Sequence, residues 1–303
     1  MAKRTLLLLL VVLPFMSLQG QSCCNAGGLA SCGSTGLLTG LRTNSASFRL
    51  MQVPFATTAA ATGDEENYRD DFYAAEWAFR YQITPRWKVM LQQPYRVNVR
   101  KFPARSETLH GLADTRLTGS YAVFDNASLG SNSLIYWELG ASVKLPTGKY
   151  DETIYYRDLP GNLNLGMGNM GYLFSTNLVF FKSKYGLGLN AGYQLNAKSR
   201  DGYHFGDQFT GGLSLFREFA WGENWKFVPL VGSMTEQFGK NHLPSGRFAE
   251  GSGGYGWLAN VGLNVRYGAF QAGLSAARPF GQNYSAGTIV AKQRYAFDCT
   301  YFF

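Results

Sequence analysis

The C-terminal stretch, from Ala286 to Phe303, is the feature that most constrains the fold, because it predicts one β-strand with two unlike faces. One face carries Tyr295, Phe297, Cys299, Tyr301 and Phe303, and the other carries Lys292, Arg294, Ala296, Asp298 and Thr300. Charged side chains are costly to bury in an ordinary packed core, whereas the aromatic face is apolar enough to contact lipid. A strand that is apolar on one side and charged on the other is typical of a transmembrane β-barrel.

The N-terminus predicts export from the cytoplasm. Two basic residues precede the apolar run 6–16, and small residues follow it, which is the pattern of a secretory signal peptide over residues 1–22. Cleavage after Ser22 fits best, and cleavage after Gly20 is the second choice. Acylation of Cys23 is an alternative, but the usual Leu three positions before the Cys is missing.

Composition agrees with membrane strands rather than membrane helices. No other apolar run approaches the ~20 residues that a spanning helix needs. Glycine (36), tyrosine (18) and phenylalanine (22) are abundant, as expected where strands bend and aromatic girdles form. The formal net charge of +8 favours anionic solutes or anionic lipid. We predict outer-membrane lipid and small-molecule solutes as partners, no nucleic acid and no cofactor.

The N-terminal segment 23–40 is rich in Cys and Gly and is predicted to be periplasmic. The chain has four cysteines, three of them in this segment. They are Cys23, Cys24, Cys32 and Cys299. In an oxidising compartment two of the first three would form a disulfide, or one of them would bridge to Cys299, and the connectivity stays open. A metal site is the alternative, although adjacent cysteines do not match the usual zinc spacings.

The remaining chain, 41–303, divides into about twelve strand-like segments whose connections alternate between short and long. Short connections lie near Pro85, Asn126, Lys184, Gly222 and Gly268, and long ones contain Asp64, Glu107, Tyr155, Tyr203, Pro244 and Gln282. This alternation places all short turns at one end of a barrel. The long connection 146–166 has room to fold over the opening. The strand after Phe227 is the weakest prediction, because Pro229 interrupts it.

We therefore predict an all-β fold, a transmembrane antiparallel up-and-down barrel of about twelve strands. The alternative is a soluble β-sandwich or lipocalin-like barrel with the apolar faces turned inward. So many broad aromatic faces supply more apolar surface than a single core needs, which favours the membrane barrel. Trp87, Trp225, Tyr267 and Phe303 would then gather at the periplasmic rim.

Four sequence blocks carry a family resemblance. They are 111–117 (GLADTRL), 139–150 (LGASVKLPTGKY), 161–170 (GNLNLGMGNM) and 202–206 (GYHFG). In their order and spacing they resemble a family of outer-membrane transporters common in Bacteroidetes-type bacteria and related to the barrel associated with the meta-cleavage pathway of phenol degradation. The resemblance implies a barrel in the bacterial outer membrane that transports small solutes. The terminal Phe303 also resembles the signal that outer-membrane barrels present to the barrel-assembly machinery.

For transport, the inward charges are the candidate lumen-lining and selectivity residues. They are Glu76, Arg80, Lys88, Arg96, Arg100, Asp114, Arg116, Glu138, Lys144, Arg266, Lys292, Arg294 and Asp298. Arg80, Arg96 and Arg116 fall on consecutive strands, where they would form a basic patch that attracts anions. In the alternative interpretation, Glu76, Asp114 and Glu138 neutralise these arginines in a network that fills the lumen. Anionic or aromatic solutes are the candidate substrates.

Two other function classes are alternatives to transport. An enzyme would need a histidine beside a nucleophile, and the three histidines, His110, His204 and His242, all fall in or beside predicted outer loops without a Gly-x-Ser-x-Gly motif. We predict no enzymatic activity. A structural or assembly barrel that binds a periplasmic partner through segment 23–40 is the stronger alternative to a transporter.

Overall fold

A computed structural model describes residues 44–57, 68–130, 132–154 and 159–303. The predicted signal peptide and segment 23–40 lie outside these ranges. The strands are β1 (Ser45–Thr57), β2 (Arg69–Gln82), β3 (Trp87–Lys101), β4 (Ser106–Leu112), β5 (Thr115–Ser128), β6 (Ser133–Leu145), β7 (Gly171–Lys182), β8 (Tyr185–Asn196), β9 (Gln208–Arg217), β10 (Phe219–Trp221), β11 (Trp225–Phe238), β12 (Gly254–Tyr267), β13 (Phe270–Tyr284), β14 (Ile289–Ala291) and β15 (Arg294–Phe302). Two short 3-10 helices, η5 (Gly161–Leu163) and η6 (Ser285–Gly287), complete the elements.

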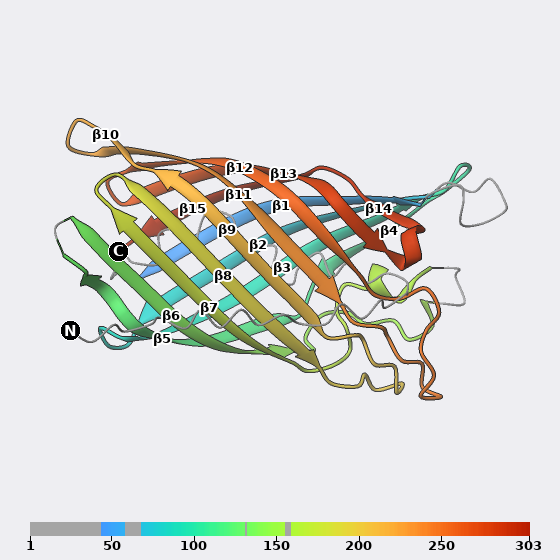
Figure 1. Cartoon of the computed structure of the whole chain (residues 1–303). Helices are drawn as coiled ribbons and strands as arrows, with labels where there is room; N and C mark the ends of the chain where they lie inside the picture. The colour runs from blue at the N-terminus through green and yellow to red at the C-terminus, as the bar shows by residue number, and fades with distance from the viewer. Residues whose placement is uncertain (1–43, 58–67, 131, 155–158) are drawn as a thin grey trace, which may run out of the picture.

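The strands form one closed antiparallel barrel, with β1 pairing β2 on one side and β14 and β15 on the other (Figure 1). Three of the fifteen segments are continuations of a neighbour in the chain: β4 leads into β5, β9 into β10 and β14 into β15. Twelve barrel strands therefore remain, each paired with its neighbours in chain order. The predicted all-β, antiparallel up-and-down barrel is confirmed. Within the described ranges no helix is long and apolar enough to cross a membrane.

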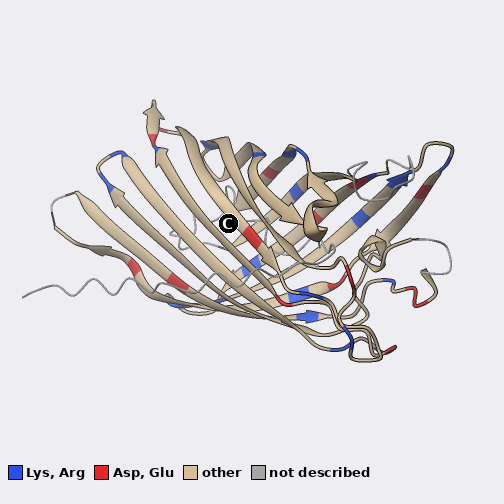
Figure 2. Cartoon of the chain, turned by 45° about the vertical axis from the view of Figure 1, so that its right-hand side comes forward, with Lys and Arg blue, Asp and Glu red and all other residues tan. Residues whose placement is uncertain are grey.

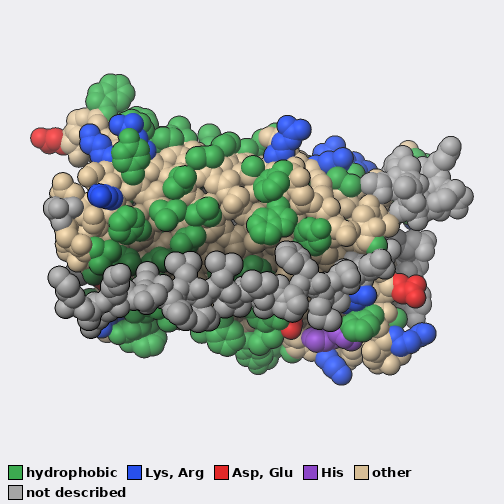
Figure 3. Space-filling model, viewed as in Figure 1, with side chains coloured by type: hydrophobic (Ala, Val, Ile, Leu, Met, Phe, Trp, Pro, Cys, Tyr) green, Lys and Arg blue, Asp and Glu red, His purple; other side chains and the backbone are tan. Residues whose placement is uncertain are grey.

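Side chains alternate between the exterior and the lumen along each strand, as the period of two requires. In β15, Tyr295 and Tyr301 are exposed while Arg294 and Asp298 are buried inside. Leu117 on β5 is likewise 51% exposed. Figure 3 shows hydrophobic side chains over the middle of the barrel wall, with charged groups mostly toward the two ends. Such an exterior suits lipid.

Aromatic pairs surround the end of the barrel where the short turns lie. Ring centroids are 4.6 Å apart for Trp225 and Tyr267, and 5.0 Å apart for Trp87 and Tyr121. Phe303 is exposed at the same rim, and its backbone N–H donates to the carbonyl of Asn44. Amphipathic rings favour the membrane–water interface, so this rim has the expected aromatic girdle.

Four local predictions were wrong, because strand pairing extends or stops at positions where the alternation of residues gave no signal. The long connection expected around Glu107 is a hairpin, in which β3 continues to Lys101 and pairs with β4. The turn expected at Asn126 lies later, because β5 runs on to Ser128. The terminal strand begins at Arg294, since η6 and the short β14 precede it, and Gln282 belongs to β13 rather than to a loop.

Proline explains a further break in the wall. β11 forms as predicted, and its Pro229 pairs with Leu263 of β12. On the other side, pairing with β9 stops at Leu230 and pairing with β10 resumes at Phe227. Since proline has no N–H to donate, the interruption between β9 and β10 falls where Pro229 offers no ladder hydrogen bond.

The connection between β6 and β7 folds into the mouth of the barrel, as its length predicted. In the described parts of this connection, 146–154 and 159–170, Ile154, Leu159 and Leu163 are almost fully buried. They pack with lumen-facing side chains of the strands, including Phe55, Phe72, Phe238 and Tyr284. The apolar residues of the loop are thus buried from water inside the barrel, and they fill its lumen at the end where the long loops lie. We call residues 146–154 and 159–170 the infolded loop.

Candidate functional site

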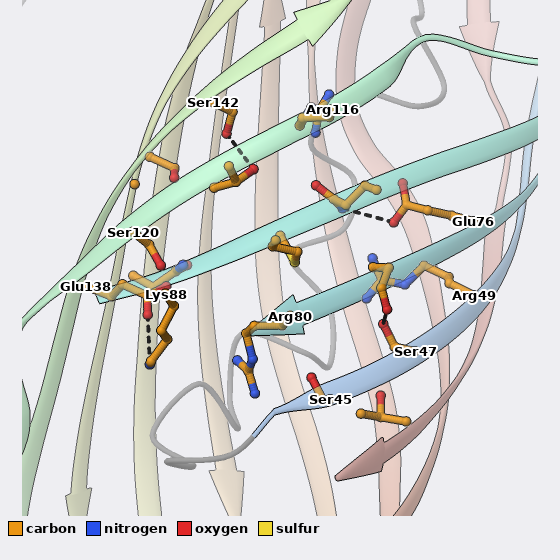
Figure 4. Close-up of a pocket in the computed structure, with 18 of the residues that line it drawn as sticks. Ser45, Ser47, Arg49, Glu76, Arg80, Lys88, Arg116, Ser120, Glu138 and Ser142 are labelled. Atoms are coloured by element: carbon orange, nitrogen blue, oxygen red, sulfur yellow. Dashed lines mark hydrogen bonds and ion pairs between the residues drawn. The ribbon is translucent and has the colours of Figure 1, made fainter. Parts of the chain in front are cut away.

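A polar cavity of about 190 Å³ occupies the lumen on the short-turn side of the infolded loop (Figure 4). Its charged lining side chains are Arg49, Glu76, Arg80, Lys88, Arg116, Glu138 and Asp298. Hydroxyl and amide groups from β1, β3, β5, β6, β7, β8, β13 and β15 also line it, together with apolar side chains such as Phe48, Met90 and Phe302. These polar groups occupy the inward-facing positions, every second residue along each strand, which is why the sequence pattern identified most of the charged ones.

Charge is distributed unevenly around the cavity. Strands β1 to β6 contribute six of its charged side chains, with Asp298 on the adjoining β15. The opposite wall presents uncharged groups such as Asn177 on β7 and Asn190 on β8. Figure 2 shows many strands without charge over much of their length, with Lys, Arg, Asp and Glu on part of the wall and at the ends. A solute in the cavity would therefore contact a charged wall on one side.

Lys88 and Glu138 form an ion pair at the cavity wall. The Lys88 ammonium lies 3.0 Å from Glu138 Oε2 and 2.5 Å from the hydroxyl oxygen of Tyr136. Tyr136 in turn donates its hydroxyl proton to Glu138. All three side chains are buried. Mutual hydrogen bonds satisfy the two charges, so this group contributes little net field to the cavity.

Arg80 and Arg116 are different, because neither forms an ion pair with a described residue. The Nε of each is buried without a hydrogen-bond partner in the described chain. Glu76, a proposed neutraliser, accepts a hydrogen bond of 3.2 Å from Gln92 instead. Figure 4 shows both guanidinium groups in the cavity with no interaction drawn to them. Glu138 attracts Arg80, and Glu76 and Asp114 attract Arg116, at distances longer than an ion pair. The two guanidinium groups therefore remain open to an anion in the lumen.

Arg96, Asp114 and Lys144, predicted as lumen-lining, hold the infolded loop. Arg96 Nη1 donates to the carbonyl of Leu165 at 3.3 Å. Asp114 accepts from the backbone N–H groups of Gly148 at 3.0 Å and Met167 at 2.9 Å. Lys144 lies 3.6 Å from the same carboxylate. These residues therefore act on the loop rather than on the cavity below it.

Two residues at this site were missed by sequence reasoning. Asn98 donates to the carbonyl of Leu163 at 2.8 Å, and its inward position on β3 was the available signal. Glu236 makes a two-pronged pair with Arg294, with N–O distances of 2.8 and 2.5 Å. Its inward position was hidden because Pro229 made the faces of β11 ambiguous.

The other predicted residues lie away from the cavity. Arg100 pairs with Asp70 at 2.6 Å near the long-loop end. Arg266 is half-buried at the short-turn rim, 4.9 Å from the ring of Phe302. Lys292 is exposed, which corrects the prediction that it faces the lumen. It lies in the gap between β14 and β15, where the strand alternation that suggested an inward position is interrupted.

The described residues contain neither a disulfide nor a metal site. Cys299 is half-buried on β15 and forms no disulfide with any of them. Cys23, Cys24 and Cys32 lie outside the described ranges. No group of His, Cys, Asp and Glu in those ranges is placed to hold a metal ion.

The histidines contact aromatic rings and backbone. In the long loops the rings of His204 and His242 stack with centroids 5.4 Å apart. His204 Nε2 lies 2.7 Å from the carbonyl of Asn196. His110 lies on β4, with Nδ1 3.1 Å from the hydroxyl of Tyr95.

Comparison with known proteins gives a fold but no family. No family model matches the chain, and no curated protein matches it. An outer membrane channel from Pseudomonas putida F1 superposes with a TM-score of 0.64 at 13% identity, covering 86% of this chain and 96% of that one. The translocator domain of the autotransporter NalP from Neisseria meningitidis has a TM-score of 0.47 at 9% identity, covering 89% and 92%. The KdgM porin has a TM-score of 0.41 at 10% identity, covering 86% of this chain and 99% of the porin.

The fold and the exterior together give the location of the chain. A closed barrel leaves no strand edge unpaired in lipid, and an aromatic, apolar outer face is what such a barrel presents to hydrocarbon. With its aromatic rim and charged lumen, this chain is a β-barrel of the bacterial outer membrane.

Proposed function

We propose that the barrel is a channel for small solutes that prefers anions. The observation that carries the proposal is the pair Arg80 and Arg116, which project into a polar cavity without ion-paired partners among the described residues. Positive groups in a low-dielectric wall attract anions and raise the energy of cations. The similarity of fold to an outer membrane channel of P. putida supports the channel class.

The infolded loop is the gate of this channel. Apolar packing against Phe55 and Tyr284 closes the mouth on one side, and hydrogen bonds from Arg96 and Asn98 hold the loop on the other. A solute can pass only when this loop moves. We therefore expect a channel that is mostly closed and opens in discrete events.

Solutes up to the size of a small organic anion fit a cavity of about 190 Å³. The resemblance to transporters related to a phenol-degradation barrel suggests aromatic acids among the solutes to test. A transport role also accounts for the charged cavity better than a purely structural barrel or an enzyme does, because a channel uses fixed charge without a nucleophile or a metal.

Reversal potentials in planar bilayers test the proposal. With a KCl gradient across the membrane, the native chain should show a reversal potential of the sign expected for anion preference. The double variant R80Q/R116Q should move that potential toward the cation side. The matched control R86Q removes an exposed arginine at a short turn and should leave it unchanged. Absence of any single-channel current in the native chain, or equal potentials for R80Q/R116Q and R86Q, would contradict the proposal.

A further inference from the structure

The outer wall of the barrel carries a groove that no charged side chain lines among its described residues. The groove has a volume of about 840 Å³ and crosses β12, β13, β15, β1, β2 and β3. Small outward side chains, Ala75 and Ala276, lie between larger ones and give the groove its depth. One row of residues crosses it, each paired with the next: Val261, Ala276, Tyr295, Gln52 and Tyr73.

Two cations lie just beyond this row, on the side of the long loops. Arg278 is exposed and follows Ala276 by two residues on β13, so it shares the outward face and lies about 7 Å further along the strand. Lys292 is exposed in the short segment between β14 and β15. Its backbone N–H donates to the carbonyl of Pro54 on β1 at 2.9 Å, which fixes it beside the same part of the wall.

These two cations are neighbours on adjacent segments. Ala277 pairs with Arg294, so Arg278 lies beside residues 292–293, which precede Arg294 in the chain. Neither Arg278 nor Lys292 forms an ion pair or a side-chain hydrogen bond with any described residue. An unpaired cation on a lipid-facing wall costs free energy. An anion held between the two side chains would offset that cost.

Positive charge continues along the same edge of the wall. Asp71 pairs with Pro54 across β1 and β2 and is fully buried between Arg69 and Lys101. Its carboxylate lies 2.9 Å from Arg69 Nε and 3.1 Å from Lys101 Nζ, and both basic side chains remain about half exposed. Two cations on one carboxylate leave a net positive charge. The described outer wall is therefore basic on the long-loop side of the groove.

Aromatic side chains indicate the depth of these cations in the membrane. Phe280 follows Arg278 by two residues and is 67% exposed, and Trp257 of β12 pairs with the next residue, Gly281. Exposed aromatic rings gather where hydrocarbon meets the lipid headgroups, and the long loops of outer-membrane barrels face the cell exterior. The cations thus lie at the headgroups of the outer leaflet, with the groove in the hydrocarbon beneath them.

We propose that this wall binds one phosphorylated lipid of the outer leaflet, with a phosphate between Arg278 and Lys292 and an acyl chain in the groove. The Arg guanidinium matches phosphate oxygens, and the Lys ammonium adds a point charge. Free phosphate would use the cations alone, and a second copy of the barrel would use the groove alone. Only a lipid uses both at once. The site lies outside the lumen and does not depend on the proposed channel function.

Native mass spectrometry of the full chain in detergent tests the site. The probes are lipid A with both phosphates, the same lipid with its phosphates removed, and inorganic phosphate. The variant R278Q/K292Q removes the phosphate contacts, and the matched control R200Q/R247Q removes two exposed cations from the long loops. Ala276→Trp fills the groove and leaves every charge in place.

We expect the native chain and R200Q/R247Q to bind one lipid A molecule with equal affinity. R278Q/K292Q should weaken lipid A binding about tenfold or more, since each basic residue at a membrane surface is worth about fivefold for an anionic lipid. Lipid A without phosphates should bind the native chain as weakly as intact lipid A binds this variant. Ala276→Trp should weaken binding about tenfold, because two or more methylenes of the acyl chain lose contact.

Equal lipid A affinity for R278Q/K292Q and R200Q/R247Q would overturn the site, as would lipid without phosphates that binds the native chain as tightly as intact lipid A. Undiminished binding to Ala276→Trp, or inorganic phosphate that binds as tightly as lipid A, would exclude a lipid as the occupant. A dimer mass that persists without lipid would place a second copy in the groove instead. Should R278Q/K292Q give no folded barrel in a heat-shift gel, the two single variants decide, and unchanged binding in both overturns the inference.

Discussion

The backbone N–H of Met167 donates to Asp114 Oδ2 at 2.9 Å, which joins the infolded loop to the barrel wall at a buried carboxylate. The other oxygen of Asp114 receives the N–H of Gly148. One side chain at the junction of β4 and β5 thus holds both ends of the loop. Because hydrogen bonds to a charged acceptor are stronger than neutral ones, we expect Asp114 to be the main polar latch of the proposed gate.

Replacing Asp114 by alanine should open the channel. Loss of two charge-assisted hydrogen bonds costs the closed state about 1.5–3 kcal/mol each, so the ratio of open to closed channels should rise about a hundredfold or more. Single-channel recording measures this directly. Glu152→Gln changes an exposed acid in the same loop and should behave as native. Equal open probabilities for the two variants would exclude Asp114 as the latch.

Acid should loosen the long loops through Asp201. Burial alone would raise the pKa of this carboxyl, but hydrogen bonds from Ser199, the N–H of Tyr203 and the hydroxyl of Tyr150 outweigh it and hold the pKa below its usual value. The stabilisation is therefore complete above the unfolded pKa of about 3.9 and disappears as the pH falls through the lower folded value. Hydrogen exchange at Tyr203, compared at each pH with the Asp201→Asn variant, should show a difference that vanishes in acid. A difference that grows in acid would contradict this assignment.

Arginine on the lipid-facing side of β9 should destabilise the barrel. Leu213 is exposed in the middle of that strand, between Leu189 and Ser233. Leu213→Arg should lower the free energy of unfolding in lipid by about 2–4 kcal/mol, as measured by denaturant titration in vesicles. Leu213→Ala is the control and should cost less, because it places no charge in hydrocarbon. A smaller loss for arginine than for alanine would mean that this face does not contact lipid.

Removal of Phe303 tests recognition by the assembly machinery. The side chain of Phe303 is 62% exposed and its backbone N–H forms one hydrogen bond, to Asn44. We expect deletion of Phe303 to reduce the amount of folded barrel in the outer membrane several-fold while refolding in detergent stays close to native. Equal losses in cells and in detergent would indicate that the residue matters for stability instead.

Much of the fold follows from side chains that alternate along each strand. The face of a residue such as Arg116 or Leu117 is a local property with a period of two, and it stays the same whatever the strand pairs with. The same alternation predicted the strand number and the inward position of Arg80 and Glu138. It failed where a strand is interrupted, as at Lys292.

Which side chains contact one another, by contrast, depended on the tertiary structure. Arg80 and Arg116 form no ion pair with a described residue, while Glu138 lies against Lys88 and Glu76 against Gln92. These distances depend on the tilt and register of separate strands. The contact of Asp114 with Met167 joins residues far apart in the chain. Sequence alone therefore determined which side of the wall each residue occupies, since that depends on its neighbours in the strand. Only the closed barrel decided which groups meet across the lumen, because register, loop path and strand breaks arise from the whole sheet at once.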